Sequence, residues 1–155
     1  MLTHFDKDGN AVMVDVSKKD ISHRKAIASG KIKLDKEIIS MIKNRDIKKG
    51  DVLTVSQIGA IMAAKKTSDL IPLCHPINTT NVVVNFEIKD VYIKAISTVK
   101  TDSKTGVEME ALTAVSTALL TIYDMVKAVS KNMIIYDIHL EYKSGGKSGE
   151  FTYGS

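Results

Sequence analysis

Apolar residues recur at spacings of three and four along residues 105–131, TGVEMEALTAVSTALLTIYDMVKAVSK, and this spacing is typical of a helix with a wide apolar face. The repeating apolar positions are Leu112, Val115, Leu119, Ile122 and Val126. Thr105 and Gly106 precede the pattern and supply a break in the chain. The sequence therefore predicts one long, largely buried helix over this stretch.

Two polar clusters interrupt this helix, one near each end. Glu108, Met109 and Glu110 lie in the first turn, whereas Asp124 and Lys127, three residues apart, share a face near the far end. Met109 and Asp124 are separated by fifteen residues, roughly 22 Å along a helix. If both clusters serve one small-molecule site, the two ends must come from different chains of a homo-oligomer. Alternatively, the glutamates only favour the positive end of the helix dipole, and Asp124 and Lys127 form a surface ion pair.

Alternating β-branched and polar residues predict four strands, and two further amphipathic patterns predict shorter helices. The strands are expected at 22–33, 79–89, 91–101 and 132–143, and the shorter helices at 34–44 and 52–68. Gly30 inside the first strand indicates a bulge or a close contact. The order β-α-α-β-β-α-β favours an α+β fold, a ferredoxin-like plait with a four-stranded antiparallel sheet, helices on one face and one extra helix.

The length of 155 residues favours a single domain spanning 1–155. Residues 1–20 are expected to form an irregular arm, and residues 144–155 a Gly-rich flexible loop and tail. The net charge of +4 suits an anionic small ligand or nucleic acid without requiring either. One cysteine, no secretory signal and no sufficiently long apolar run predict a cytoplasmic protein without a membrane span.

The only two prolines, Pro72 and Pro76, bracket Leu73, Cys74 and His75. Residues that precede proline are biased towards extended backbone, so this segment should be stiff and non-helical. Such a segment could hold a histidine at a fixed position in a site, because stiffness lowers the ordering cost of binding. It could equally be a rigid connection with a buried, inert cysteine.

The C-terminal stretch 143–149, KSGGKSG, is Gly-rich and carries Lys143 and Lys147. Such a loop can present backbone N–H groups to an anion, although a flexible tail is the simpler interpretation. A P-loop is excluded because Glu141 stands where that motif needs glycine. Aromatic content of 5% disfavours an RNA-recognition domain, and one cysteine with four scattered histidines shows no zinc-ligand spacing.

Several stretches together closely resemble the MoaC family of molybdenum cofactor biosynthesis, in order from about residue 13 to residue 149. The longest and most specific are LIPLCHP (70–76) and TGVEMEALTA (105–114). The others are MVDVS (13–17), Arg24 within HRKAIASG, KGD (49–51), AAK (63–65), TIYDM (121–125), Lys127-Ala128 and 143–149.

The resemblance implies a lyase. Its substrate would be a cyclised dihydro-GTP, (8S)-3′,8-cyclo-7,8-dihydroguanosine 5′-triphosphate. Its products would be cyclic pyranopterin monophosphate and pyrophosphate. It also implies a reaction without a redox cofactor, with Mg²⁺ assistance to the triphosphate left open, and a homohexamer built as a trimer of dimers with sites between subunits. A non-catalytic nucleotide-binding subunit of the same fold is the alternative, and an RNA-binding plait is a more distant one.

By the same resemblance, the catalytic residues would be Asp124, Lys127 and Lys49. Several other residues would contact the substrate through its ring system or its phosphates, and none would bind a metal. These substrate-binding candidates are Leu73, Cys74, His75, Met109, Glu110, Arg24, Lys65, Glu108, Lys143 and Lys147. The cations suit a triphosphate, and a lysine can also exchange protons if burial or crowding lowers its pKa.

Overall fold

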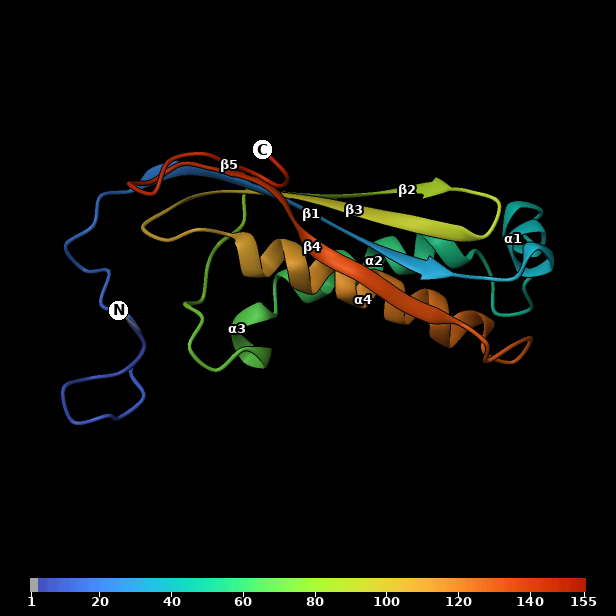
Figure 1. Cartoon of the computed structure of the whole chain (residues 1–155), viewed down its shortest axis with the longest axis horizontal. Coiled ribbons are helices and arrows are strands. Elements are labelled where there is room, and N and C mark those ends of the chain that lie inside the picture. The colour runs from blue at the N-terminus through green and yellow to red at the C-terminus, as the bar shows by residue number, and fades with distance from the viewer. Residues whose placement is uncertain (1–2) are drawn as a thin grey trace.

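The computed structural model describes residues 3–155 and contains a twisted sheet with helices on one face (Figure 1). The elements are β1 (Ser22–Lys33), α1 (Lys36–Lys43), α2 (Val52–Ala64), α3 (Thr67–Leu70), β2 (Asn81–Ile88), β3 (Tyr92–Ser103), α4 (Glu108–Val126), β4 (Ile134–Ser144) and β5 (Phe151–Thr152).

The strand order in the sheet is β2-β3-β1-β4-β5, and every neighbouring pair is antiparallel. The first four strands have the order of a ferredoxin-like plait, so the predicted fold class is confirmed. The sheet has five strands rather than the predicted four, because Phe151 and Thr152 pair with Lys143 and Tyr142 at the edge of β4. This fifth strand lies within the C-terminal segment, where no strand was predicted.

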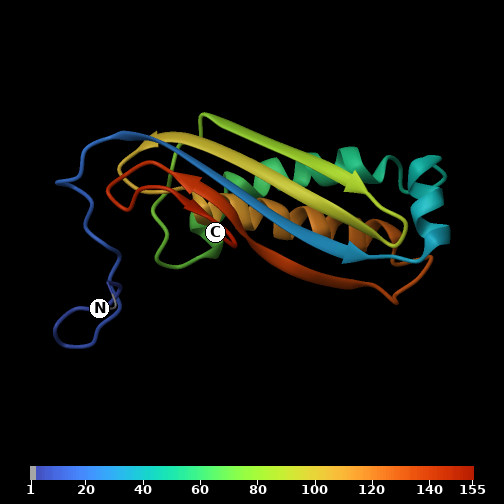
Figure 2. The same cartoon turned by 45° about the horizontal axis from the view of Figure 1, so that its top comes forward.

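Helices α2 and α4 lie side by side beneath the sheet (Figures 1 and 2). α4 is the central core element, and its fully buried residues include Ala111, Val115, Leu119 and Ile122. By length and composition, α4 is also the one helix of residues 3–155 that could cross a membrane. Its buried face packs on β1 and β3, which identifies it as the core helix of this fold.

Gly30 in β1 is a point of close contact, as predicted. A Cβ at this position would lie 2.8–2.9 Å from side-chain carbons of Ile138, Leu119 and Val115. The register between β1 and β4 shifts at the same place, and Asp137 there has a left-handed φ of 56°. The absence of a side chain at Gly30 therefore allows α4 and β4 to close over β1.

The predicted helix 52–68 is divided in the structure. α2 ends at Ala64, and α3 forms a separate turn. The buried Thr67 hydroxyl donates to the carbonyl oxygen of Ala64 at 3.0 Å, which satisfies an acceptor that a continuing helix would have used. The long helix is also shorter than its apolar pattern, running over 108–126 rather than 105–131.

Candidate functional site

A cavity of about 320 Å³ lies where the N-terminal end of α4 meets the stiff segment before β2 and the N-terminal arm. It brings together five predicted substrate-binding residues from these two elements and Glu108 beside them. The lining residues are Thr3, His4, Val14, Val16, Lys19, Leu73, Cys74, His75, Ile77, Thr105, Gly106, Glu108, Met109 and Glu110. We call this the ring cavity.

Both a backbone hydrogen bond and a side-chain hydrogen bond hold the segment between Pro72 and Pro76 in place. The amide of Cys74 donates to the carbonyl of Ile71 at 3.1 Å, forming a turn that begins the segment. The Nε2 atom of His75 lies 2.6 Å from the carbonyl oxygen of Val14, which ties the N-terminal arm to the cavity. For that contact Nε2 must carry a proton, since the carbonyl can only accept.

Cys74 forms part of the cavity wall. Burial raises the pKa of its thiol, and the nearby Glu110 carboxyl raises it further. A raised pKa keeps the sulfur as the weakly nucleophilic thiol at neutral pH. The position therefore suits a packing surface rather than a covalent catalyst.

Glu110 is the most unusual group of the ring cavity, with only 3% of its surface exposed. Burial raises the pKa of its carboxyl to about 7, and the neighbouring Glu108 adds to that shift. At neutral pH the carboxyl therefore exists in both protonation states. It can accept a hydrogen bond or donate one, which suits recognition of a heterocyclic ring edge.

Lys143 at the end of β4 contacts both the cavity and the Gly-rich loop. Its Nζ atom lies 3.3 Å from a carboxylate oxygen of Glu108 and also hydrogen-bonds the hydroxyl of Ser148. Both side chains of the Lys143–Glu108 pair are mostly buried. A half-buried ion pair is screened less than a surface pair, so it holds the Glu108 side chain in place.

Arg24 in β1 is held by backbone acceptors. Its Nε atom donates to the carbonyl of Ser103 at 3.1 Å, and an Nη atom donates to the carbonyl of Lys104 at 3.2 Å. Arg24 and Lys147 line a second cavity, of about 510 Å³, together with Lys19, Asp20, Ser22, Gly146 and Ser148. We call this the basic cavity.

Asp124, Lys127 and Lys49 form a separate cluster at the other end of α4. The Nζ of Lys127 lies 2.8 Å from Asp124 Oδ1, and the Nζ of Lys49 lies 2.9 Å from the Asp124 carbonyl and 3.5 Å from Oδ2. The hydrogen bond from Lys127 lowers the pKa of Asp124, and the same bond raises the pKa of Lys127. Within one chain, Lys127 is thus a protonated amine; the idea that crowding lowers its pKa does not hold.

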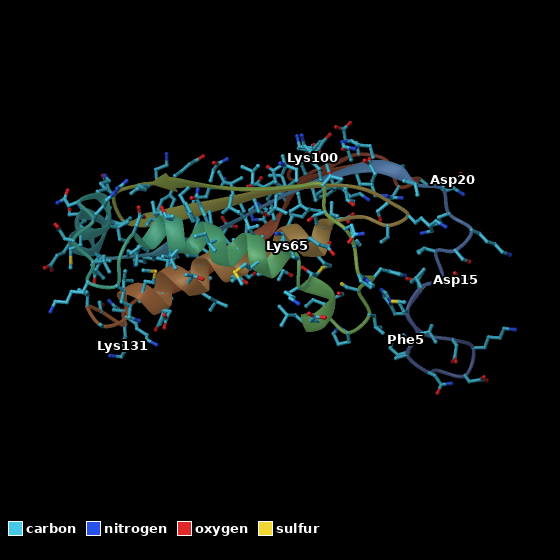
Figure 3. The ribbon with its side chains drawn as sticks, turned by 180° about the vertical axis from the view of Figure 1, so that it is seen from behind. Phe5, Asp15, Asp20, Lys65, Lys100 and Lys131 are labelled. Carbon is cyan, nitrogen blue, oxygen red and sulfur yellow. The ribbon has the colours of Figure 1, made fainter. Side chains whose placement is uncertain are left out.

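The two groups of predicted residues occupy opposite ends of α4, whose 19 residues span roughly 28 Å. Lys65 caps the end of α2 that points towards the N-terminal end of α4, and Lys131 follows the C-terminal end of α4 (Figure 3). Among residues 3–155, no group of three or more His, Cys, Asp or Glu side chains could hold a metal ion. The roles assigned to the site residues stay predictions.

The N-terminal arm supplies lining residues that the sequence interpretation did not identify. Val14, Val16 and Lys19 line the ring cavity, and the described arm has no strand longer than one bridge, between Phe5 and Ala11. Ser22 at the start of β1 was also not identified. The only available signal was the stretch Met13–Ser17, which belongs to the resemblance but was not assigned to the site.

The sequence is similar to those of known proteins over nearly its whole length. The sequence model of the MoaC family matches residues 13–146 of this chain. A Clostridium botulinum protein is 57% identical over 150 residues, covering 96% of this chain and 94% of the relative. A Heliobacterium modesticaldum protein is 53% identical over 152 residues, covering 97% of this chain and 96% of the relative. A Dinoroseobacter shibae protein is 56% identical over 154 residues, covering 97% of this chain and 96% of the relative. All three are named cyclic pyranopterin monophosphate synthase.

The α+β fold together with the names of these relatives identifies an enzyme that acts on a small molecule. The chain belongs to the MoaC family. The predicted family and the predicted enzymatic function in molybdenum cofactor biosynthesis are thereby confirmed.

Proposed function

We propose that the chain is a lyase that converts the cyclised dihydro-GTP into cyclic pyranopterin monophosphate and pyrophosphate. Relatives at 52–57% identity over nearly their whole length carry the product in their names. The observation that carries the proposal is the ring cavity, in which Glu110, with a pKa raised to about 7, lies among Leu73, Cys74 and Met109. This combination of apolar walls and one proton-exchanging carboxyl fits a guanine-derived ring.

The half-exposed cluster at the other end of α4 would provide the proton transfers. Lys127 enters the reaction protonated, because Asp124 raises its pKa, and is therefore suited to donate a proton or to neutralise developing negative charge. Asp124 holds both amines through contacts of 2.8 Å to Lys127 and 3.5 Å to Lys49. Lys49 would be the second cation of the reacting centre.

A complete site would need two chains. Met109, Leu120, Asp124 and Lys127 are all exposed and lie on one face of α4. A second copy packed antiparallel on this face would bring its Asp124 and Lys127 beside the ring cavity of the first. Oligomerisation would complete the site in this way.

Exposed apolar side chains support a partner on this face. α2 is apolar on all sides, and a helix of that kind is normally buried on all sides. Large apolar side chains on α2 and α4 are nevertheless exposed in the single chain, namely Val55, Ile58, Met62 and Leu120. We propose a dimer through these helices and, by resemblance to the family, a hexamer of three dimers.

The reaction would need no redox cofactor, because substrate and products differ only by bond rearrangement and release of pyrophosphate. The chain's own groups would hold and move protons, and its lysines and Arg24 would neutralise phosphate charge, a task that Mg²⁺ could share. We place the reaction in the cytoplasm, where a single unpaired cysteine such as Cys74 remains reduced.

The test is pyrophosphate release from the cyclised dihydro-GTP, with GTP as the control substrate. Release from the cyclised compound alone supports the proposal. Binding of that compound without release would instead identify a non-catalytic nucleotide-binding subunit. Binding of generic RNA that weakens steeply with salt, without turnover, would favour the RNA-binding alternative.

A further inference from the structure

Strand β4 contains an extra residue near its C-terminal end. Leu140 pairs with Ala28 of β1, whereas Tyr142 pairs with the adjacent β1 residue, Ile27. Glu141 between them has no partner in β1 and forms a β-bulge, in which two residues of one strand oppose one residue of the other. Bulges of this kind often lie next to active sites, where they redirect a side chain.

The bulge decides which face of the sheet carries Lys143. Lys143 lies opposite Ala26, which belongs to the core between the sheet and the helices. Directly opposite residues of antiparallel strands share a face, so Lys143 also points to the helix side. If β4 continued from Leu140 without the extra residue, Lys143 would lie opposite Lys25 on the other face. The bulge therefore turns Lys143 towards Glu108, whose carboxylate oxygen lies 3.3 Å from its Nζ atom.

Glu141 and Tyr142 themselves both lie on the face of the sheet that is turned away from the helices (Figure 1). The Lys25 amine is 5.6 Å from the centre of the Tyr142 ring, and the Ser29 hydroxyl donates to the Glu141 carboxylate. Lys25 and Ser29 are an odd number of positions from the buried Ala26, so their side chains point away from the helices. Consecutive side chains of a regular strand alternate, and two on one face are the mark of the bulge.

The Glu141 carboxylate fixes the bulge to the neighbouring strands. Ser29 of β1, only 1% exposed, donates its hydroxyl at 2.5 Å, and the Nζ of Lys94 of β3 lies 3.2 Å from the same oxygen. The hydrogen bond from Ser29 lowers the pKa of the Glu141 carboxyl, and Lys94 lowers it further. The Glu141 carbonyl accepts from the amide of Tyr153 at 2.9 Å, just after β5. Glu141 thus ties β4 to β1 and β3 through its side chain and to the C-terminal segment through its backbone.

We propose that Glu141 and Ser29 are positioning residues, which hold the bulge that turns Lys143 into the site. The inference rests on the proposed function, in which the lysines of the site neutralise the substrate's phosphate charge. Both residues lie on the face of the sheet away from the ring cavity, so they act through Lys143 rather than on the substrate. Loss of their hydrogen bond releases the bulge and lets the Lys143 ammonium move away from Glu108. The expected consequence is weaker substrate binding rather than slower chemistry.

The first experiment measures how fast each lysine of the full chain is acetylated by a limiting amount of acetic anhydride, with mass spectrometry of the peptides as readout. In the wild type, Lys143 should react more slowly than the exposed Lys131, because its amine is mostly buried and paired with Glu108. Glu141→Ala should accelerate acetylation of Lys143 about tenfold, the factor expected when a hydrogen bond to a charged group is lost. The rate at Lys131 should not change.

Three further variants separate the bulge contact from a general loss of structure. Ser29→Ala removes the same hydrogen bond from the side of β1 and should also accelerate acetylation of Lys143. Glu141→Gln keeps an acceptor for the Ser29 hydroxyl and should retain the slow rate. Glu87→Ala is the matched control, since Glu87 is a strand carboxylate paired with Lys89 but lies in β2.

The second experiment measures KM and kcat for the cyclised dihydro-GTP in a double-mutant cycle. Glu141→Ala should raise KM about tenfold and change kcat by less than about twofold, because it displaces a binding group. In a chain that already carries Lys143→Ala, the same substitution should have no further effect on KM. A merely structural role of Glu141 would instead raise KM by the same factor in both backgrounds.

The outcomes separate this inference from the proposed function. Unchanged acetylation of Lys143 in both Glu141→Ala and Ser29→Ala overturns the inference, even if turnover is normal. An equal rise in KM with and without the Lys143 side chain also overturns it. A wild-type chain that releases no pyrophosphate would contradict the proposed function, and the acetylation rates would then decide by themselves whether the bulge positions Lys143.

Discussion

The two ends of α4 are built on different physical principles. At the N-terminal end, Glu110 is 3% exposed and carries a pKa shifted by burial to about 7. At the C-terminal end, the side chains of Asp124 and Lys127 are 59% and 49% exposed, and their pKa shifts come from their mutual hydrogen bond. Within a single chain, Glu110 is already buried at one end of α4, whereas Asp124 and Lys127 are exposed at the other.

Under the proposed site shared by two chains, this difference marks the exposed cluster as the half that the partner chain would cover. An exposed ion pair contributes little to the stability of a fold, so stability alone does not explain why Asp124, Lys127 and Lys49 are placed together. The same charges become effective in catalysis when another surface excludes water from them. We therefore interpret Asp124, Lys127 and Lys49 as reacting groups that would be covered by the ring cavity of a partner chain.

The largest expected effect is the loss of turnover when a residue at the exposed end of α4 is replaced. Lys127→Ala should lower pyrophosphate release by about 10²–10⁴-fold, the range for loss of a positioned proton donor. The melting temperature should stay almost unchanged, because the side chain is half exposed. Lys131→Ala, a neighbouring exposed lysine, is the control and should retain activity. Equal activity in both variants would remove Lys127 from the reacting centre.

The next effect is on assembly. Leu120→Glu places a charge in the exposed apolar face of α4 and should dissociate the proposed dimer, with turnover falling about a hundredfold. Analytical ultracentrifugation would report the mass, and circular dichroism would confirm that the chain remains folded. Lys100→Glu, on a strand rather than on this helix face, is the control. A folded, fully active monomer would contradict a site shared between chains.

A substitution at the buried end of α4 should change the free energy of unfolding and its dependence on pH. Because the folded pKa of Glu110 lies above its unfolded value of about 4.5, the folded state binds the extra proton, and stability falls as pH rises from about 4.5 through 7. Glu110→Gln removes this ionisation. It should raise the free energy of unfolding by about 2–3 kcal/mol at pH 8 and change it little at pH 5. Urea titrations at both pH values would measure this, and an equal effect at pH 5 and pH 8 would contradict a burial-shifted carboxyl.

The smallest effect should come from the matching substitution at the exposed end. Asp124→Asn breaks two surface ion pairs, with Lys127 and Lys49, and should leave the free energy of unfolding almost unchanged. The same urea titrations would detect a larger change. A loss comparable to that of a buried pair would mean that this cluster is structural within the single chain, and the contrast between the two ends would disappear.

Periodicity was sufficient to predict the strands, the long helix and the plait, because burial of one face dictates spacing. It could not predict β5, since the pairing of two residues at a sheet edge depends on the position of β4 rather than on a pattern in Phe151 and Thr152. Gly30 did indicate the bulge or close contact that is found there. Its partners in α4 and β4 could not be predicted, because they depend on how these two elements share the space above that residue.

The candidate site was predictable where short sequence spacing creates the geometry. Asp124 and Lys127 form the predicted pair because three residues span one helical turn. The contribution of the arm was not predictable, because Lys19 and Val14 reach the ring cavity through irregular backbone. That backbone is held by long-range contacts of His75 with Val14 and of Lys104 with Ser17.

The most direct test of a shared site is complementation between two inactive chains. Lys127→Ala and Glu110→Ala, coexpressed with different tags and purified together, should recover activity, because random assortment leaves about a quarter of the sites with both halves intact. Coexpression of Lys127→Ala with Asp124→Ala should recover none, because both changes damage the same half. Recovery to about a quarter of wild-type turnover in the first pair alone is the predicted result. No recovery in the first pair, with both chains present in one oligomer, would contradict the account.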